Sequence, residues 1–212
     1  MKAPLVYLLA LSAFVASCSK NDHNSAPKEK VLYQNNFDED DGNWSLDDYD
    51  SITVSLSGGY YQIANHRYNY LWEELTNPVF DSLDNQIALE MSFSMQADTG
   101  ADYGGGGLMW NCDTSDIAYF FDIYTDGYYE IFGYPDGQTY KQYATDDASN
   151  LIKPGGNNML RITLTDNMLH FIINGTEIYQ MAATGSGLDG PGIATEGQSA
   201  IKVDYFKAIQ LK

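Results

Sequence analysis

Residues 160–165 alternate strictly between apolar and polar side chains, which is the pattern of a strand that buries one face. The two faces are Leu160, Ile162 and Leu164 on one side and Arg161, Thr163 and Thr165 on the other. We expect the first set to point into a core and the second toward solvent.

The alternation resumes after a short polar break, in 169–173, where Leu169, Phe171 and Ile173 share a face. Asp166-Asn167 predicts the tight turn between these two strands, and Asn174-Gly175 predicts a second turn into a strand at about 176–181. This part of the chain therefore predicts a three-stranded antiparallel meander.

Strand patterns bounded by Gly, Asn and Asp recur along the rest of the chain, and no helical pattern longer than two turns appears after residue 30. The further segments are 31–37, 52–56, 59–65, 86–97, 105–112, 117–125, 128–135 and 200–211. About a dozen short strands at this spacing predict an all-β, two-sheet antiparallel sandwich.

The first 17 residues differ from the rest. Lys2 precedes an apolar run over 5–15, which is too short for a permanent membrane span and predicts a secretory signal peptide. Val15-Ala16-Ser17-Cys18 resembles the bacterial lipobox, in which the cysteine is acylated and becomes the first residue of the mature protein. Residues 18–30 are polar and predict a flexible tether, so we expect an outer-membrane lipoprotein on the periplasmic or the cell-surface side.

Charge narrows the range of partners. The net charge is −18, and removal of residues 1–17 takes away one lysine and no acid, which gives −19. Such a field repels phosphate backbones, so nucleic acid is excluded as a partner, whereas calcium and neutral ligands remain compatible. Cys112 is the only other cysteine, and its apolar surroundings predict a buried thiol.

Aromatic residues are the compositional outlier, with 17 tyrosines, 9 phenylalanines and 3 tryptophans. In 117–125, Tyr119, Phe121 and Ile123 fall on one face, and Phe120, Asp122 and Tyr124 on the other. We expect the Asp122 face to be exposed, and by the same alternation Asn111 exposed beside buried Leu108 and Trp110. The candidate ligand-binding residues are Tyr70, Trp72, Asn111, Asp122, Tyr124 and Tyr134, with Tyr68, Tyr128 and Tyr129 as further aromatic candidates. Packing of these rings between strands is the alternative interpretation.

The order of these features resembles the concanavalin A-like lectin/glucanase superfamily, and within it laminin-G-like jelly rolls and exported jelly rolls of unknown function. The motifs that carry the resemblance are Phe37 with Trp44, Gly59-Tyr60-Tyr61-Gln62-Ile63, Leu108-Met109-Trp110, Tyr119-Phe120-Phe121-Asp122-Ile123, Leu169-His170-Phe171-Ile172-Ile173-Asn174-Gly175 and Val203-Asp204-Tyr205-Phe206. The resemblance covers 31–212 and implies two antiparallel sheets, one of them concave, with ligands lying across the concave face.

Catalytic members of this superfamily carry a Glu-x-Asp-x-x-Glu strand, because retaining glycoside cleavage needs two neighbouring carboxylates. Segment 117–125 offers only Asp122, and 128–135 offers only Glu130. Catalysis of that type is therefore not expected, although carboxylates on adjacent strands remain an open alternative.

The resemblance also implies a structural calcium ion, held by the aspartate of the last strand, here Asp204. Backbone oxygen atoms near the first strands would complete the site, here from Asp38 and Gly59. Calcium accepts six to eight oxygen ligands in irregular geometry. The acidic cluster around Asp38 has the alternative interpretation of a solvated loop.

The leading hypothesis is a membrane-anchored, non-catalytic jelly-roll domain for carbohydrate binding or adhesion. One alternative is a glycoside hydrolase or lyase with a non-standard site. Another is a structural partner in an outer-membrane complex that uses a sheet face against a surface protein.

Overall fold

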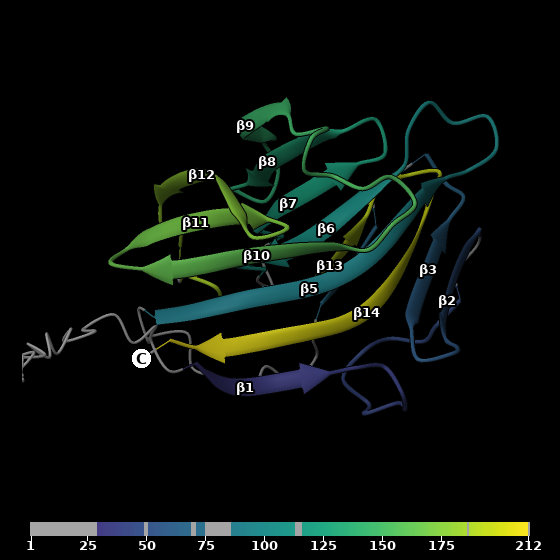
Figure 1. Cartoon of the computed structure of the whole chain (residues 1–212), viewed down its shortest axis with the longest axis horizontal. Coiled ribbons are helices and arrows are strands. Elements are labelled where there is room, and N and C mark those ends of the chain that lie inside the picture. The colour runs from purple at the N-terminus through teal and green to yellow at the C-terminus, as the bar shows by residue number, and fades with distance from the viewer. Residues whose placement is uncertain are drawn as a thin grey trace, which may run out of the picture.

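The computed structural model describes residues 29–48, 51–68, 86–112, 116–185 and 187–211, and the backbone of residues 71–74. Within these ranges the chain forms fourteen strands and no helix (Figure 1). The strands are β1 (Lys30–Asn35), β2 (Ile52–Leu56), β3 (Tyr61–Asn65), β4 (Leu71–Glu74), β5 (Gln86–Ala97), β6 (Gly105–Trp110), β7 (Ala118–Tyr124), β8 (Tyr128–Tyr134), β9 (Lys141–Asp147), β10 (Asn158–Thr165), β11 (Met168–Ile173), β12 (Thr176–Ala182), β13 (Gly192–Thr195) and β14 (Ser199–Gln210).

The larger sheet has eight strands in the order β12-β11-β10-β5-β14-β3-β2, with β1 also paired to β14. The two 12-residue strands β5 and β14 form its central antiparallel pair. Along the other edge of β14, β3 pairs with Ser199–Val203 and β1 pairs with the segment that ends at Gln210. Strand β1 therefore begins at one end of the sheet, and β5 ends at the opposite end (Figure 1).

The smaller sheet has six strands in the order β4-β13-β6-β7-β8-β9 and packs against the larger sheet. The core between the sheets takes Phe93 and Phe206 from the larger sheet and Trp110 and Phe121 from the smaller one, all fully buried. Face-to-face packing of two antiparallel sheets defines a β-sandwich, so the predicted all-β jelly-roll fold is confirmed.

The meander shows why the local prediction succeeds. Residues on one face of β10, from Leu160 to Leu164, are buried in the core, as the alternation predicts. Asp166 and Asn167 both have positive φ, 50° and 61°, and Asn174 and Gly175 have φ of 49° and 85°. Two consecutive positive φ values are typical of the type I′ turn, whose twist matches that of the flanking strands.

The sequence pattern does not predict three of the strands. Strands β4 and β9 lie at the two edges of the smaller sheet, and β13 lies between β4 and β6. Strands β4 and β13 have four residues each, too few for an alternation to be recognised. The sequence of β9, KQYATDD, is mostly polar and has no apolar alternation, which suits an edge strand but resembles a loop.

The predicted signal peptide and the acylated Cys18 lie outside the described residues, as does most of the 18–30 tether. Among the residues that the structure describes, no helix has the length and apolar character needed to cross a bilayer.

Candidate functional site

The outer face of the smaller sheet, which is turned away from the main core, carries the residues around which a site is built. A register row crosses all six strands and consists of Trp72, Ala194, Gly107, Asp122, Glu130 and Thr145. Tyr119, Phe121 and Ile123 pack in the main core, whereas Phe120 belongs to a separate cluster on the outer face. The predicted division of β7 into two faces is therefore confirmed.

The expected exposure of Asp122 is wrong, because this side chain is fully buried on the outer face. Its carboxylate leans over Gly107, where an added Cβ would lie 2.7 Å from Oδ1 of Asp122. Beside it, Met109, Phe120 and Phe132 form a second buried cluster. The middle of the outer face is thus filled by the protein's own side chains and is not an open groove.

Tyr124 lies on the same face as Asp122, two residues farther along, and is the last residue of β7. Its ring occupies the space above Gly105, where an added Cβ would meet Cδ1 at 2.4 Å. The glycines at the start of β6 therefore permit the close approach of Asp122 and Tyr124, which accounts for that part of the glycine run in the sequence. The Tyr124 ring also makes an edge contact with Tyr103, at 5.5 Å between centroids.

Glu130 lies directly opposite Asp122 in the β7–β8 hairpin and is half-buried. The hydroxyl of Tyr124 donates to its Oε2 at 3.2 Å, and Tyr140 and Gln142 both donate to its Oε1. Hydrogen bonds of this kind fix the orientation of the carboxylate.

Glu196 approaches the same place from β13. Its backbone amide donates to the carbonyl of Gly105 at 3.0 Å, and Gly105 pairs with Tyr124. Burial, and then the negative charge of Glu130, raise the pKa of Glu196, while a hydrogen bond from the amide of Gly197 opposes the shift.

Burial and the neighbouring carboxylates also shift the pKa of Tyr124. Burial raises its pKa well above the usual range, and the charges of Asp122, Glu130 and Glu196 act in the same direction. The Tyr124 hydroxyl consequently stays protonated and serves as a donor.

These side chains line a cavity of about 230 Å³ at the end of the outer face, which we call the tyrosine–acid cleft. Its lining residues are Tyr103, Tyr124, Asp126, Tyr128, Glu130, Thr145 and Glu196. A neighbouring hollow of about 220 Å³ shares Tyr103 and Glu196 and adds Tyr68 and Asp102. The solvent-exposed fractions of Tyr68, Tyr103 and Tyr128 are 85%, 44% and 49%, so three exposed rings gather at one end of the sandwich.

The other candidate residues lie away from the cleft or outside the described residues. Tyr134 is half-buried farther along β8, where it packs against Phe120, Phe132 and Tyr140. Tyr129, at 6% exposure, faces the core. Tyr70 lies outside the described residues, and Trp72 is described by its backbone alone, opposite Ala194.

Asn111 corrects a second expectation. It is 7% exposed, whereas the alternation predicts an exposed side chain. Strand β6 ends at Trp110, and Asn111 has a φ of 54°, which ends the alternation and turns its side chain against Gly185. Trp110 is fully buried as predicted, whereas Cys112 is half-buried and packs against the outer-face cluster.

Of the candidate calcium ligands, Asp38 in the N-terminal loop between β1 and β2 lies beside Gly59 in the turn between β2 and β3. Oδ1 of Asp38 is 3.4 Å from the position of a Cβ on Gly59, whose φ is 77°. Asp204 lies at the bulge of β14, between Val203 and Tyr205. The described residues contain no group of three or more acid, histidine or cysteine side chains that could hold a metal. Oxygen donors of this kind fit calcium, provided that backbone carbonyls complete the coordination.

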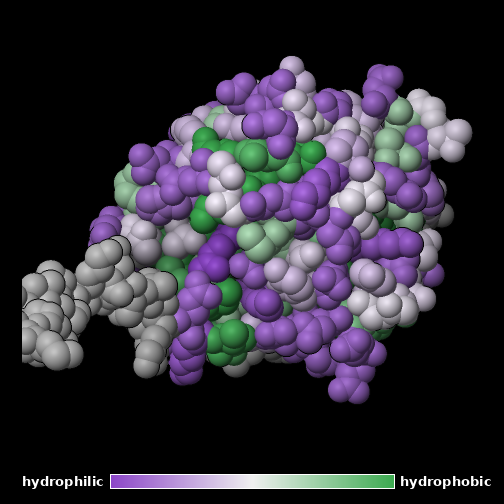
Figure 2. All heavy atoms as spheres, viewed as in Figure 1, coloured by the Kyte–Doolittle hydropathy of each residue, from purple (hydrophilic) through white to green (hydrophobic). Residues whose placement is uncertain are grey.

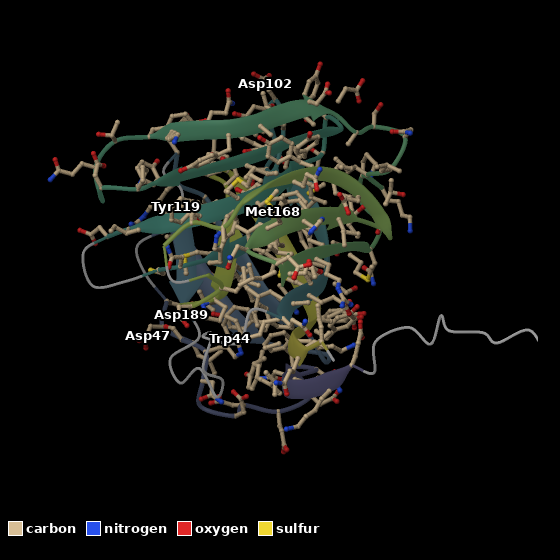
Figure 3. All side chains as sticks on the ribbon, turned by 90° about the vertical axis from the view of Figure 1, so that its left-hand side faces the viewer. Trp44, Asp47, Asp102, Tyr119, Met168 and Asp189 are labelled. Atoms are coloured by element: carbon tan, nitrogen blue, oxygen red, sulfur yellow. The ribbon has the colours of Figure 1, made fainter. Side chains whose placement is uncertain are left out.

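The acidic N-terminal loop between β1 and β2 lies away from the cleft. Figure 3 shows Asp102, beside the cleft, at one end of the molecule and Asp47, in the N-terminal loop, toward the other. A calcium ion near Asp38 would therefore support the fold at a distance from the cleft.

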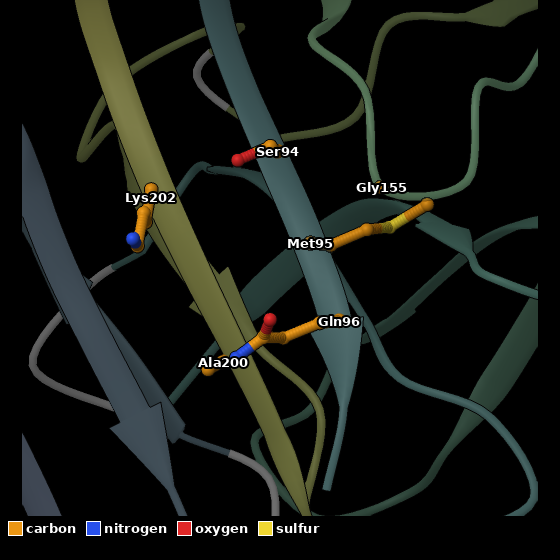
Figure 4. Close-up of a pocket in the computed structure, with 6 residues that line it drawn as sticks. All are labelled: Ser94, Met95, Gln96, Gly155, Ala200 and Lys202. Carbon is orange, nitrogen blue, oxygen red and sulfur yellow. The ribbon is translucent and has the colours of Figure 1, made fainter.

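The outer face of the larger sheet offers a different kind of surface. It is mostly hydrophilic (Figure 2), and its hollow over β5 and β14 is lined by Ser94, Met95, Gln96, Gly155, Ala200 and Lys202 (Figure 4). Nearby, Glu90 forms salt bridges with Arg161 at 3.0 Å and Lys207 at 3.7 Å, and accepts a hydrogen bond from Tyr205. None of the described residues that line this hollow is aromatic, in contrast to the rings that gather at the cleft.

Comparison with known proteins identifies the fold. No protein-family model matches the chain, and no curated protein matches it in sequence. The carbohydrate recognition domain of Emp46p in its potassium-bound form matches in structure with a TM-score of 0.58 at 13% identity, over 84% of this chain and 95% of that one.

Two further solved structures extend the comparison. The exoplasmic/lumenal domain of VIP36, bound to Ca²⁺ and Man3GlcNAc, matches with a TM-score of 0.61 at 13% identity, over 87% of this chain and 91% of that one. The catalytic domain of an endo-1,3-beta-glucanase (laminarinase) from Thermotoga petrophila matches with 0.61 at 8% identity, over 88% and 99%. The fold is therefore a concanavalin A-like jelly roll.

Proposed function

We propose that this protein is an exported, lipid-anchored binding protein whose jelly-roll domain holds carbohydrate in the tyrosine–acid cleft without cleaving it. The observation that carries the proposal is the gathering of Tyr68, Tyr103 and Tyr128 around two adjoining polar hollows, the cleft itself and its neighbour. Aromatic rings cover the apolar faces of sugars, and the surrounding carboxylates and hydroxyls accept or donate hydrogen bonds to sugar hydroxyls.

Structural neighbours support the ligand class. The Emp46p structure is that of a carbohydrate recognition domain, and the VIP36 structure is the form bound to Ca²⁺ and Man3GlcNAc. Because sequence identity to them is low, the support extends to the kind of ligand and not to particular contacts.

The position of the cleft suits a protein anchored at Cys18. Lys30 pairs with Gln210 at the end of the sheet where β5 begins, and the cleft loops follow Ala97 at the end where β5 finishes. At about 3.3 Å per residue, the 12-residue strand β5 separates the two ends by roughly 35 Å. The tether thus enters at the end opposite the cleft, which leaves the cleft accessible on an outer-membrane lipoprotein.

A glycan array tests the binding function. Wild-type mature protein is expected to bind a defined set of glycans, and Tyr103→Ala and Tyr128→Ala are expected to lose them. Tyr60→Ala is the matched control, because Tyr60 is a half-buried tyrosine in the turn before β3. Binding that survives both cleft substitutions would contradict the proposal.

A second candidate function is glycoside hydrolysis, and it is favoured by one observation. Glu130 and Glu196 line the same cleft, and their surroundings differ: Glu130 accepts three hydrogen bonds, whereas burial raises the pKa of Glu196. Such a difference is typical of a base and acid pair. Release of reducing sugar from a polysaccharide panel, abolished by Glu130→Gln, would favour the enzyme over the binding protein.

The lipid anchor has its own test. Replacement of Cys18 by serine is expected to abolish incorporation of labelled palmitate and to release the protein from the membrane fraction. Labelled palmitate on the Cys18→Ser variant would contradict the anchor.

A further inference from the structure

The charged side chains that line the tyrosine–acid cleft are all acidic. Asp126, Glu130 and Glu196 line it, and Asp102 lines the adjoining hollow. The salt bridges among the described residues include none of these four carboxylates. Among the residues that the structure describes, no lysine or arginine lines either hollow.

Two described cations on neighbouring segments lie outside the cleft. Lys141 lies over the ring of Tyr143, which packs against the main core, at 4.6 Å from the ring centroid. Arg67 precedes Tyr68 in the sequence but lines neither hollow. The negative charge of the cleft is therefore available to a ligand.

Aromatic rings stand beside these carboxylates. Tyr103 and Tyr128 are about half exposed, and both line the same cavity as Glu130 and Glu196. The face of a tyrosine ring attracts cations within about 6 Å of its centroid. Rings combined with carboxylates form the surroundings that proteins use to bind organic ammonium groups.

We infer that the cleft selects glycans that carry free amino groups, such as glucosamine units, over neutral and acidic glycans. The inference rests on the proposed carbohydrate-binding function and narrows its ligand class. The ammonium group lies between the Glu130 and Glu196 carboxylates, and the rings of Tyr103 and Tyr128 cover the apolar face of the sugar.

The burial of Glu196 supports this selection. Its ionised form is disfavoured in the free protein by desolvation and by the charge of Glu130, and the amide of Gly197 offsets that cost only in part. A bound ammonium group offers the opposite charge at this place. Acidic sugars, in contrast, would meet at least three carboxylates.

Direct titration of the mature protein tests the inference. The probes are β-1,4-linked glucosamine oligosaccharides and their fully N-acetylated counterparts of equal length. We expect the amino form to bind at least about 10-fold more tightly, which corresponds to about 1.4 kcal/mol. Raising the ionic strength from about 0.05 M to about 0.5 M shortens the Debye length, and should remove most of that preference.

Variants locate the effect. Glu130→Gln and Glu196→Gln are expected to lower the preference for the amino form, with thermal melting as the check of folding. Glu177→Gln removes the same charge from the exposed edge strand β12 of the other sheet and is expected to leave the preference unchanged.

The outcomes separate the inference from the proposed function. Equal affinity for both oligosaccharides, with loss in Tyr103→Ala, would overturn the selection for amino groups and leave carbohydrate binding intact. A lysine-rich peptide that binds the cleft when no glycan does would overturn both.

Discussion

Asp122 and Glu130 face each other across the β7–β8 hairpin on the outer face of the smaller sheet, yet their surroundings differ sharply. Asp122 is fully buried above Gly107, whereas Glu130 is half-buried, accepts hydrogen bonds from Tyr124, Tyr140 and Gln142, and opens onto the cleft. The Asp122 carboxylate is therefore part of the packed face, whereas the Glu130 carboxylate lies on a surface that a ligand can reach.

The packing around Asp122 depends on the absence of a side chain at Gly107. An added Cβ would lie 1.9 Å from the backbone oxygen of Phe121, a distance that no rotamer change relieves. We expect Gly107→Ala to lower the free energy of unfolding by about 1–3 kcal/mol or more through overpacking. Chemical denaturation measures the effect.

Gly156→Ala is the control for that substitution, because its nearest neighbour, at 3.3 Å, is Cβ of the exposed Lys153. We expect a much smaller change there. Equal effects of the two substitutions would contradict the close contact between β6 and β7.

Calcium binding at Asp38, Gly59 and Asp204 predicts a stability that depends on calcium concentration. A ligand at about 100 times its dissociation constant stabilises the native state by about 2.7 kcal/mol. We expect chelation to lower the melting temperature of the wild type and to have no effect on Asp204→Asn. Asp166→Asn, in the exposed β10–β11 turn, is the control. An identical melting temperature with and without chelator would remove calcium from the account.

The raised pKa of Glu196 has a consequence for stability. The native state binds this proton more tightly than the unfolded chain, so ionisation of Glu196 destabilises the fold as the pH rises through its unfolded and native pKa values. At neutral pH, Glu196→Gln is therefore expected to raise the melting temperature.

The same geometry predicts a coupling between Glu196 and Glu130. Removing the charge with Glu130→Gln should lower the pKa of Glu196, as followed by NMR titration of its carboxyl carbon. A Glu196 pKa that does not move would place the two carboxylates too far apart to share a ligand.

The sequence predicts those features that depend on short-range patterns. Alternation in 160–165 and the Asn174-Gly175 turn define the meander, and alternation also places Trp110 and Phe121 in the core. Face assignment requires only that side chains alternate along a strand.

Exposure and the composition of the cleft depend on long-range contacts. Asp122 lies on the predicted face but is buried, because the absent side chain at Gly107 leaves room for it. Glu196 reaches the cleft only because β13 pairs with β6, and β13 is too short to recognise from sequence. Tyr68 and Tyr128 stand out in the sequence as aromatic candidates, but no local signal places them beside Glu196.

Calorimetric titration of one array-selected glycan measures whether the tyrosine–acid cleft holds carbohydrate. The proteins are wild type, the double variant Tyr103→Ala/Tyr128→Ala, and Tyr60→Ala. Loss of two stacking rings is expected to weaken binding by at least about 10-fold, or about 1.4 kcal/mol, because each ring covers an apolar face of the sugar. We expect this loss in the double variant alone, with an unchanged melting temperature. Equal affinity in all three proteins would contradict it.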